Sequence, residues 1–442
     1  MKPIIIYVLM ALTAAASASA QIPPNHSIKS TKGNIELYVA NNGIIGYNND
    51  KAKSGFIWPR GSSAQYIFGG GVILFKLYTN TPLSPYHIPE YTYNYMNSKS
   101  WFVPGAISDG ELMQPDMASK YRVYSSINYD RKSGEELFGG TGPKWPIWFD
   151  NDYIGSKYGD YKIDESGRTS AISNPRIISD EDIVAIYKDT DTTVNTGALK
   201  HKGLMPYGLE MQTRVYSYDN DAQKNAIFIN WILTNESEKD LNDFTFAPMF
   251  DIDITKSTNA FVGVDNDIIL FPKDSSYVSF ATAMDEYEKG ETFGYISFKW
   301  IETPKVNDTK IDYSSESNPP LKVYGYRQIP SSIVMEDLNS NFFKYGLEVE
   351  EKGEQKVLMP TNMFTLPAHQ SASFVMQINM TPPDEDYPVM NEKKRSQIET
   401  ELASNEIFFK DKLSSVESIA ESKQINVYPN PVKDGNLNIH LN

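Results

Sequence analysis

Pairs of aspartates two residues apart recur along the chain, and their carboxylates are the side chains best suited to chemistry. The pairs are Asp150 and Asp152, Asp189 and Asp191, Asp219 and Asp221, Asp251 and Asp253, and Asp265 and Asp267. Residues i and i+2 of a strand share a face, so two such carboxylates repel unless they are solvated, lie in a turn or share a cation. Ca²⁺ is the hard cation that accepts oxygen ligands from irregular loops.

The strongest cation candidate combines two of these pairs. Asp251 and Asp253 end an expected strand, and a short loop through Gly263 leads to the second pair. The predicted Ca²⁺ ligands are Asp251, Asp253, Asn259, Asp265 and Asp267. Their spacing is not that of an EF-hand. The alternative is that Asp and Asn stand here because they tolerate turn geometry and cap local N–H groups.

Other kinds of reactive site have little support in the sequence. The chain has no cysteine, which excludes disulfides and thiolate chemistry. The five histidines are dispersed, at His26, His87, His201, His369 and His440. No Gly-x-Ser-x-Gly elbow is present, and we expect His201 and His369 to be loop residues. The run Gly69-Gly70-Gly71 is not followed by the Lys and Ser/Thr of a phosphate loop, so it predicts a tight turn or a bulge.

Aromatic residues cluster in three loop-like stretches. Flat rings can stack on the apolar faces of sugar rings, so these stretches suggest a carbohydrate platform. The candidate ligand-binding residues are Tyr93, Tyr95, Trp101, Trp145 and Trp148. Core packing is the favoured alternative, because aromatic side chains dominate burial in β-proteins. A glycosidase would need only two carboxylates across a cleft, which a sequence this acidic does not exclude.

The composition limits the partners and favours strands. A formal net charge of -15 opposes binding to nucleic acid or to an anionic membrane. Aromatic residues make up 12% of the chain, including 28 Tyr and 21 Phe, and such rings pack well on pleated sheets. With 442 residues, of which 40% are hydrophobic, the chain can build sizeable cores.

Short apolar or alternating runs, separated by Gly, Asn, Asp and Pro, position these groups. Their spacing is typical of an antiparallel all-β protein, so we predict a β-sandwich-type body over residues 21–383. The body could divide into two sandwich units near residues 200–206. Residues 226–234 form the clearest expected strand, and residues 241–250 should return beside it as a hairpin.

The period of the pattern changes after the body. Apolar residues stand among charges at Ile398, Leu402, Ile407 and Phe408. This spacing predicts a helix over residues 384–413 that packs on the body. Residues 414–423 are polar and are expected to form a linker.

The beginning of the chain has the features of a signal peptide. Lys2 precedes an apolar run from Ile4 to Ala15, and Ala18-Ser19-Ala20 is a small-residue cleavage signature. We therefore expect residues 1–20 to be removed. The apolar run is shorter than the roughly 20 residues that cross a bilayer, and no later stretch approaches that length. No transmembrane segment is predicted.

The end of the chain contains Tyr428, Pro429, Asn430 and Pro431, followed by an alternating Leu437, Ile439 and Leu441. Residues 424–442 resemble the opening of the β-sandwich sorting domain that type IX secretion systems recognise on their cargo. The resemblance implies that the Tyr-Pro-Asn-Pro segment is a sorting signal and that the secretion machinery is a partner. It also implies an extracellular or outer-membrane surface location in a Gram-negative bacterium, with surface polysaccharide as a potential attachment. The strands that should follow are missing, so we expect a truncated sorting domain.

Three segments of the body also resemble uncharacterised type IX cargo proteins. They are Trp58-Pro59-Arg60-Gly61-Ser62, Lys188-Asp189-Thr190-Asp191 and Asp251-Ile252-Asp253. This resemblance implies no activity. The sequence therefore favours a secreted or surface-exposed, non-catalytic structural or adhesive module, stabilised by Ca²⁺. The alternative is a surface protein that binds or cleaves carbohydrate.

Overall fold

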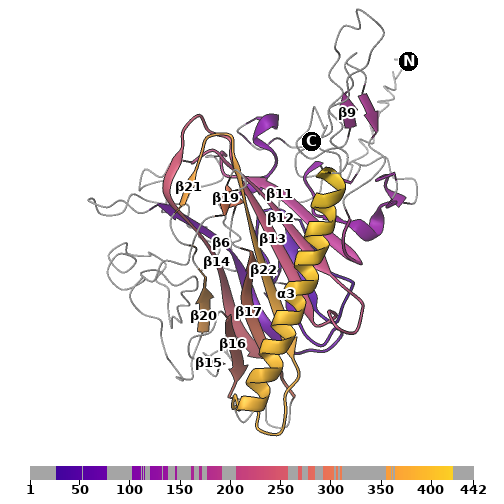
Figure 1. Cartoon of the computed structure of the whole chain (residues 1–442), viewed down its shortest axis with the longest axis vertical. Helices are drawn as coiled ribbons and strands as arrows, with labels where there is room; N and C mark the ends of the chain where they lie inside the picture. Colours follow the sequence, from indigo (N-terminus) through magenta and orange to yellow (C-terminus); the bar gives the residue numbers. More distant parts are fainter. Residues whose placement is uncertain are drawn as a thin grey trace, which may run out of the picture.

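Strands dominate the computed structural model of this chain, and one long helix follows the last of them (Figure 1). The structure describes residues 26–51, 53–76, 102–110, 112, 114, 120–131, 133–137, 145–146, 161–163, 169–171, 177–191, 206–256, 267–270, 277–283, 292–302, 305–306, 309–310, 355–359, 361 and 364–421. Within these residues the fold is an antiparallel β-sandwich with a C-terminal helix. The predicted fold class is confirmed.

The first sheet has seven strands. Their order is β1 (Ser27–Lys29), β2 (Glu36–Ala40), β5 (Phe56–Ile57), β6 (Gln65–Lys76), β14 (Leu241–Thr255) and β20 (Gln355–Leu358), with β21 (Phe364–Leu366) also beside β14. Two further pairs lie outside the large sheets, namely β3 (Tyr47–Asn48) with β4 (Lys53–Ser54), and β9 (Tyr161–Ile163) with β10 (Thr169–Ala171).

The second sheet has eleven strands. Its main order is β15 (Asp267–Leu270), β16 (Tyr277–Thr282), β17 (Tyr295–Glu302), β22 (Ser371–Thr381), β13 (Ala226–Asn235), β12 (Leu209–Ser217), β11 (Glu181–Lys188) and β7 (Val103–Pro104). Three short strands complete this sheet: β8 (Tyr124–Ser125) pairs with β11, and β18 (Lys305–Val306) pairs with β22 and with β19 (Thr309–Lys310). The 3-10 turns are η2 (Ile107–Asp109), after β7, and η3 (Ser126–Asn128), after β8.

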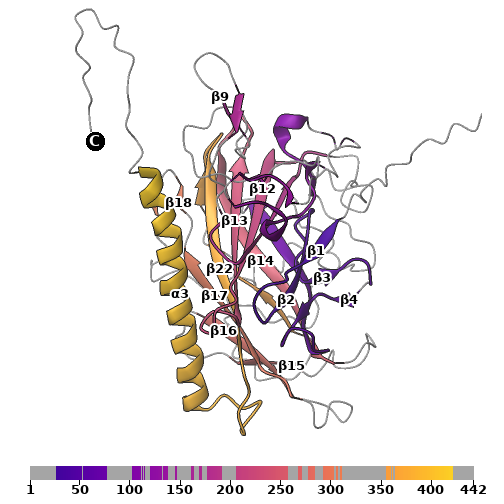
Figure 2. The same ribbon diagram turned by 90° about the vertical axis from the view of Figure 1, so that its right-hand side faces the viewer.

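The main core fills the space between the two sheets, while α3 (Glu392–Glu421) lies on the other side of the eleven-stranded sheet (Figure 2). Aromatic pairs bridge the sheets: Phe246 of β14 stacks on Phe374 of β22 with ring centroids 3.9 Å apart. Strand β13 serves two cores, because Ile229 and Trp231 face the first sheet while Phe228 faces the helix. A strand that is buried on both faces has a continuous apolar sequence, which explains why β13 was the clearest strand predicted from the sequence.

Helix α3 differs from its prediction at both ends. It begins at Glu392 instead of near residue 384, and it continues to Glu421 through most of the segment expected to be a linker. The side-chain oxygen of Asn391 accepts the backbone N–H of Lys394 at 2.8 Å, which is an N-cap contact. Residues 385–388 form a turn before this cap.

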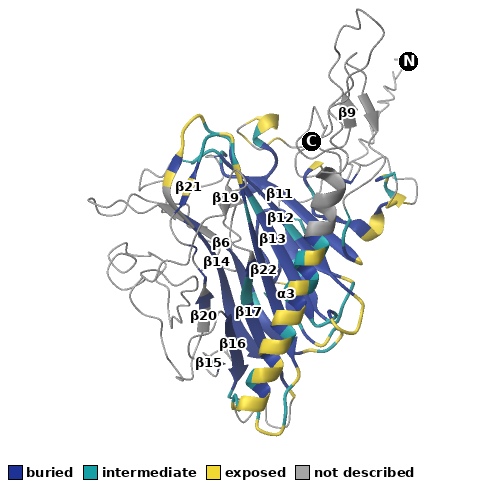
Figure 3. Ribbon diagram, in the orientation of Figure 1, coloured by how far each residue is buried: buried dark blue, intermediate teal, exposed yellow. Residues whose placement is uncertain are grey.

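One stripe of α3 is buried and the opposite side is exposed (Figure 3). Ile398 and Leu402 pack on one apolar cluster of the sheet, and Phe409 and Leu413 pack on another. Ile407 is 71% exposed, so its predicted packing on the body is wrong. Five residues beyond Leu402, Ile407 is turned away from the stripe that spacings of three and four residues build.

The expected hairpin of β13 and β14 is also wrong. Strand β13 pairs with β12 on one side and β22 on the other, so it has no free edge for β14. Residues 236–240 instead lead the chain across to the other sheet, where β14 pairs with β6. The sequence pattern shows two strands joined by a polar turn, and this pattern is the same for a hairpin and for a crossing between sheets.

Both sheets combine strands from before and after the proposed boundary at residues 200–206. Strands β11 and β12, which flank that segment, pair over their lengths within one sheet. One core cluster extends from Ile35 to Met380. The described body is therefore a single sandwich, and a division into two sandwich units at this point is not supported.

The glycine run lies inside β6 and forms no turn. The register with β14 shifts where Asp251 faces Gly69 and Ile252 faces Ile67, so the predicted bulge is present at this point. A Cβ atom on Gly70 would come within 2.4 Å of the Phe250 ring and 2.5 Å of the Met249 carbonyl oxygen. Glycine is required here because the neighbouring strand approaches so closely.

Candidate functional site

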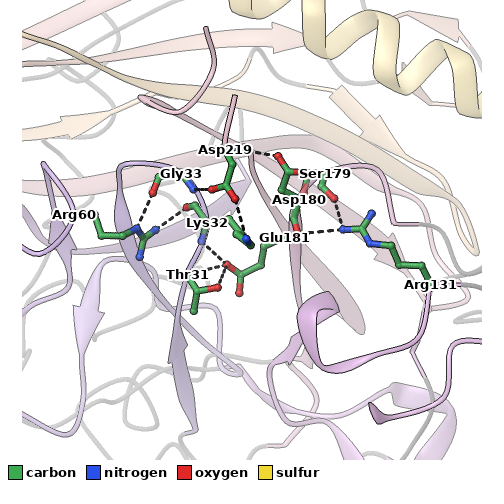
Figure 4. A network of polar contacts seen from close by, with 9 residues as sticks. All are labelled: Thr31, Lys32, Gly33, Arg60, Arg131, Ser179, Asp180, Glu181 and Asp219. Carbon is green, nitrogen blue, oxygen red and sulfur yellow. Dashed lines mark hydrogen bonds and ion pairs between the residues drawn. The ribbon is translucent and has the colours of Figure 1, made fainter. Parts of the chain in front are cut away.

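Charged side chains converge where the loop between β1 and β2 meets the beginning of β11 and the end of β12 (Figure 4). The group consists of Thr31, Lys32, Gly33, Arg60, Arg131, Ser179, Asp180, Glu181 and Asp219, and we call it the clasp. It joins the seven-stranded sheet to the eleven-stranded sheet through residues as far as 187 positions apart. Because this charged network links the two sheets, it is taken as the candidate site.

Glu181, the first residue of β11, is the buried centre of the clasp. Its carboxylate accepts hydrogen bonds from the Thr31 N–H, from the Lys32 N–H at 3.0 Å and from the Thr31 hydroxyl at 3.0 Å. The Ser125 hydroxyl donates to its other oxygen at 2.6 Å. Four donors therefore satisfy the acceptor oxygens of this buried carboxylate.

Asp219 supplies the second carboxylate, just after β12. It accepts the Gly33 N–H at 2.7 Å and forms an ion pair with Lys32 at 2.8 Å. The hydrogen bond from Lys32 holds the pKa of Asp219 below its ordinary value, and the same contact raises the pKa of Lys32. Gly33 has a φ of 71°. The successive backbone N–H groups of the loop that ends at Gly33 form a concave donor surface of the kind that binds anions. Two carboxylates of the protein itself occupy these donors.

Arg60, from the Trp-Pro-Arg-Gly-Ser segment, organises the backbone of the same loop. Its guanidinium donates to four carbonyl oxygens, those of Ser30, Lys32, Gly33 and Ile35. Burial lowers the pKa of Arg60, while the nearby carboxylates of Glu36, Glu181 and Asp219 oppose this effect. Only the planar, five-donor guanidinium can hold so many acceptors at once. The Trp-Pro-Arg-Gly-Ser segment thus has a structural role here.

The Lys-Asp-Thr-Asp segment also lies inside the protein. Lys188 is fully buried and its ammonium donates to the carbonyl oxygens of Ala106 and Gly110. The carboxylate of Asp189 accepts the backbone N–H groups of Tyr207 at 2.9 Å and Leu209 at 2.8 Å. These charges therefore fix the loops around one end of β11.

The predicted Ca²⁺ ligands are only partly described. Asp251 and Asp253 lie on the same face of β14, opposite the core residues Phe250 and Ile252, as the alternation predicted. Asp267 begins β15, and its carboxylate accepts the Ile254 N–H at 3.3 Å, which brings it beside the end of β14. Asn259 and Asp265 lie outside the described residues. Among the residues that are described, no three acidic or histidine side chains are grouped to hold a metal, so the site stays a prediction.

The pair Asp219 and Asp221 follows the turn alternative. Asp219 pairs with Lys32, and Asp221 pairs with Lys224 at 2.7 Å on the exposed side of the turn after β12. Each carboxylate therefore has a lysine partner of its own, and the two share no partner.

Trp145 is the one predicted carbohydrate-stacking residue that lies in the described part of the chain. It is fully buried, with its ring centroid 5.5 Å from that of Tyr129. The core-packing alternative holds for this residue. Tyr93, Tyr95, Trp101 and Trp148 lie outside the described residues, so their proposed role stays a prediction.

Two histidines are described, and neither contacts a serine or threonine hydroxyl there. His369 lies in a loop as predicted, with its Nε2 atom 3.3 Å from the Glu238 carboxylate. His26 precedes β1, and its Nδ1 atom accepts the Val123 N–H at 3.4 Å. The expected signal peptide at residues 1–20 and the sorting signal from Tyr428 to Pro431 are outside the described residues.

The sequence pattern missed the clasp almost entirely. Glu181 and Asp219 stand in ordinary charged stretches, and no local spacing links them to Thr31 or Gly33. Arg60 is the only residue of the clasp that belongs to one of the three segments singled out in the sequence. Among the described helices, none combines the length and the apolar character needed to span a bilayer.

No protein-family model and no curated protein sequence matches this chain. Solved structures give weak matches. A candidate aldose 1-epimerase from Escherichia coli K12 is 8% identical, with 81% of this chain and 100% of that chain covered and a TM-score of 0.28. The Slr1438 protein from Synechocystis sp. PCC 6803 is 9% identical, with 81% and 96% covered and a TM-score of 0.28. A galactose mutarotase-like protein from Clostridium acetobutylicum is 9% identical, with 81% and 95% covered and a TM-score of 0.25. Likeness at this level assigns no function.

Proposed function

We propose that this protein is a non-catalytic structural or adhesive β-sandwich module that acts at the cell surface or outside the cell. The saturation of the clasp supports this proposal. Its central carboxylate, Glu181, accepts hydrogen bonds from four donors of the protein itself. The Arg60 guanidinium donates to four carbonyl oxygens of the protein. A general acid or base must instead face the substrate proton that it transfers.

Incubation with a broad panel of polysaccharides tests the absence of catalysis. We expect some of these polysaccharides to retain the labelled protein, and we expect none of them to release reducing sugar. Release of sugar that disappears on substitution of a single Asp or Glu would establish an enzyme and overturn the proposal. Failure to bind any glycan, protein or cell surface would remove the adhesive part and leave a structural role.

The proposed route outward is type IX secretion. The signals at residues 1–20 and 424–442 support it, and both act as addresses read by export machinery. In a Gram-negative host with this system, we expect the full chain on the surface or in the medium. Deletion of residues 424–442 should leave it in the periplasm. Equal distribution of the two forms would contradict the proposed role of Tyr428–Pro431.

Calcium is the proposed stabilising ligand of the module. A ligand that binds only the folded state raises stability by about 2.7 kcal/mol at a concentration 100 times its Kd. The melting temperature of the mature chain should therefore be higher in millimolar Ca²⁺ than in EDTA. The double variant D251N/D253N should lose this difference, and D221N, at an exposed carboxylate, should retain it. Equal melting temperatures in Ca²⁺ and EDTA would assign these aspartates to turn chemistry.

A further inference from the structure

His26 connects the start of β1 to a distant segment. Its Nδ1 atom accepts the backbone N–H of Val123, 97 residues away, at 3.4 Å. Its own backbone N–H donates to the Asn41 side chain at 2.9 Å, and its carbonyl accepts the Asn41 N–H at 2.9 Å. Asn41 in turn donates to the Tyr121 carbonyl oxygen at 3.4 Å. The imidazole therefore acts as an acceptor at a junction of three segments.

The surroundings of His26 disfavour a positive charge. Burial lowers the pKa of the imidazole, and the Arg122 guanidinium lowers it further, while Asp50 opposes both effects. Arg122 is held in place by the Tyr129 hydroxyl at 3.0 Å and by Glu136 at 2.9 Å. These two contacts hold the guanidinium beside the histidine.

We propose that His26 is an acid-sensitive latch whose neutral imidazole holds β1 at the edge of the seven-stranded sheet and whose protonation releases that strand. In a protonated imidazole both ring nitrogens are donors. Nδ1 then faces the Val123 N–H donor to donor, and the new charge faces Arg122. Both changes act against the same attachment.

The geometry allows β1 to leave without disrupting the sheet. The strand has three residues, and among the described strands it pairs with β2 alone. Its Ile28 side chain is only partly buried. Strand β2 keeps its other partner, because the Tyr38 N–H donates to the Gly55 carbonyl oxygen at 2.9 Å. The ion pair of the clasp persists at a pH at which His26 is protonated, since the hydrogen bond from Lys32 keeps the pKa of Asp219 low. Release would therefore pivot near Ser30 and expose the edge of β2, which is a template for strand pairing.

Hydrogen exchange at single amides, measured by NMR on the deuterated full chain, tests the latch. We compare protection factors, which remove the intrinsic effect of pH, at about pH 7.5 and about pH 5.0. The Val123 and Asn41 amides, both bonded to His26, should lose protection by about tenfold at the lower pH. The Tyr38 amide, which faces the retained side of β2, should keep its protection.

Two variants isolate the cause. His26→Gln replaces the imidazole with a group that does not titrate, so Val123 and Asn41 should show no pH-dependent loss. His369→Gln removes an exposed histidine and should behave like the wild type. Unchanged protection in the wild type, or equal loss at Tyr38, would overturn the latch. If His26→Gln does not fold, the wild-type imidazole can be titrated directly, and its midpoint must coincide with the loss at Val123. A different midpoint also overturns the proposal.

Discussion

Arg60 is the residue on which most backbone contacts of the clasp depend. Lysine at this position keeps the charge but cannot reach four carbonyl oxygens in the plane of a guanidinium. We expect Arg60→Lys to lower the free energy of unfolding by about 2 to 4 kcal/mol, because buried carbonyl groups lose their donors.

Urea unfolding provides the measurement, and Arg131→Lys provides the control. Arg131 also binds carbonyl oxygens, those of Ser179 and Asp180, but it is exposed. Its replacement should cost less than about 1 kcal/mol. Equal costs for the two variants would show that Arg60 has no special place in the clasp.

Asp219 gives the clasp a dependence on pH. Its pKa in the folded state lies below the ordinary value, with the Lys32 contact as the main cause. A carboxyl group with a lowered pKa stabilises the fold above its unfolded pKa of about 3.9, and this contribution is lost as the pH falls through the folded value. Asp182 acts in the opposite direction, because burial raises its pKa.

The difference in melting temperature between the wild type and Asp219→Asn should therefore be largest near neutral pH. It should shrink as the pH falls below about 4, where the wild-type carboxylate is also neutralised. Asp411→Asn, on the exposed side of α3, is the control variant. A constant difference across this range would mean that the charge of Asp219 does not contribute.

Helix α3 shows at the scale of an element what packing adds to a pattern. Phe409 stacks on Phe228 of β13 with ring centroids 4.3 Å apart, while Ile407 points to solvent only two residues earlier. We expect Phe409→Ala to cost about 3 to 5 kcal/mol in unfolding free energy, since it opens a cavity between helix and sheet. Ile407→Ala should stay within about 0.5 kcal/mol. Similar effects in chemical denaturation would place the buried stripe of α3 elsewhere.

The sequence predicted elements better than their partners. Alternating and continuous apolar runs located β13, β14 and the helix, because these patterns follow from burial alone. They could not tell a hairpin from a crossing between sheets, since both need two apolar strands and a polar turn. The same limit applies to the clasp: its contacts join Thr31 to Glu181 across 150 residues, a separation at which local spacing has no information. The start of the helix was placed too early because the apolar spacing does not mark Asn391, whose side chain accepts the Lys394 N–H, as the N-cap.

At the scale of the whole molecule, the shared core predicts cooperative unfolding. Both sheets contain strands from each half of the chain, and one cluster of buried side chains extends between them. Calorimetry of the mature chain should show one main transition for the body, with equal calorimetric and van't Hoff enthalpies. Two separate transitions of comparable size would restore the division near residues 200–206.

The interleaving of strands also determines when the protein can fold. In each sheet, a central strand pairs with a strand that comes much later in the chain: β6 pairs with β14, and β13 pairs with β22. The Gly294 N–H even donates to the Tyr66 hydroxyl across 228 residues. Sandwiches built from such distant contacts fold in milliseconds to seconds, far more slowly than helical proteins. While such a chain is being synthesised, neither sheet can be completed until the late strands are made. An unfolded chain of this kind is the state in which a polypeptide can pass through a narrow pore.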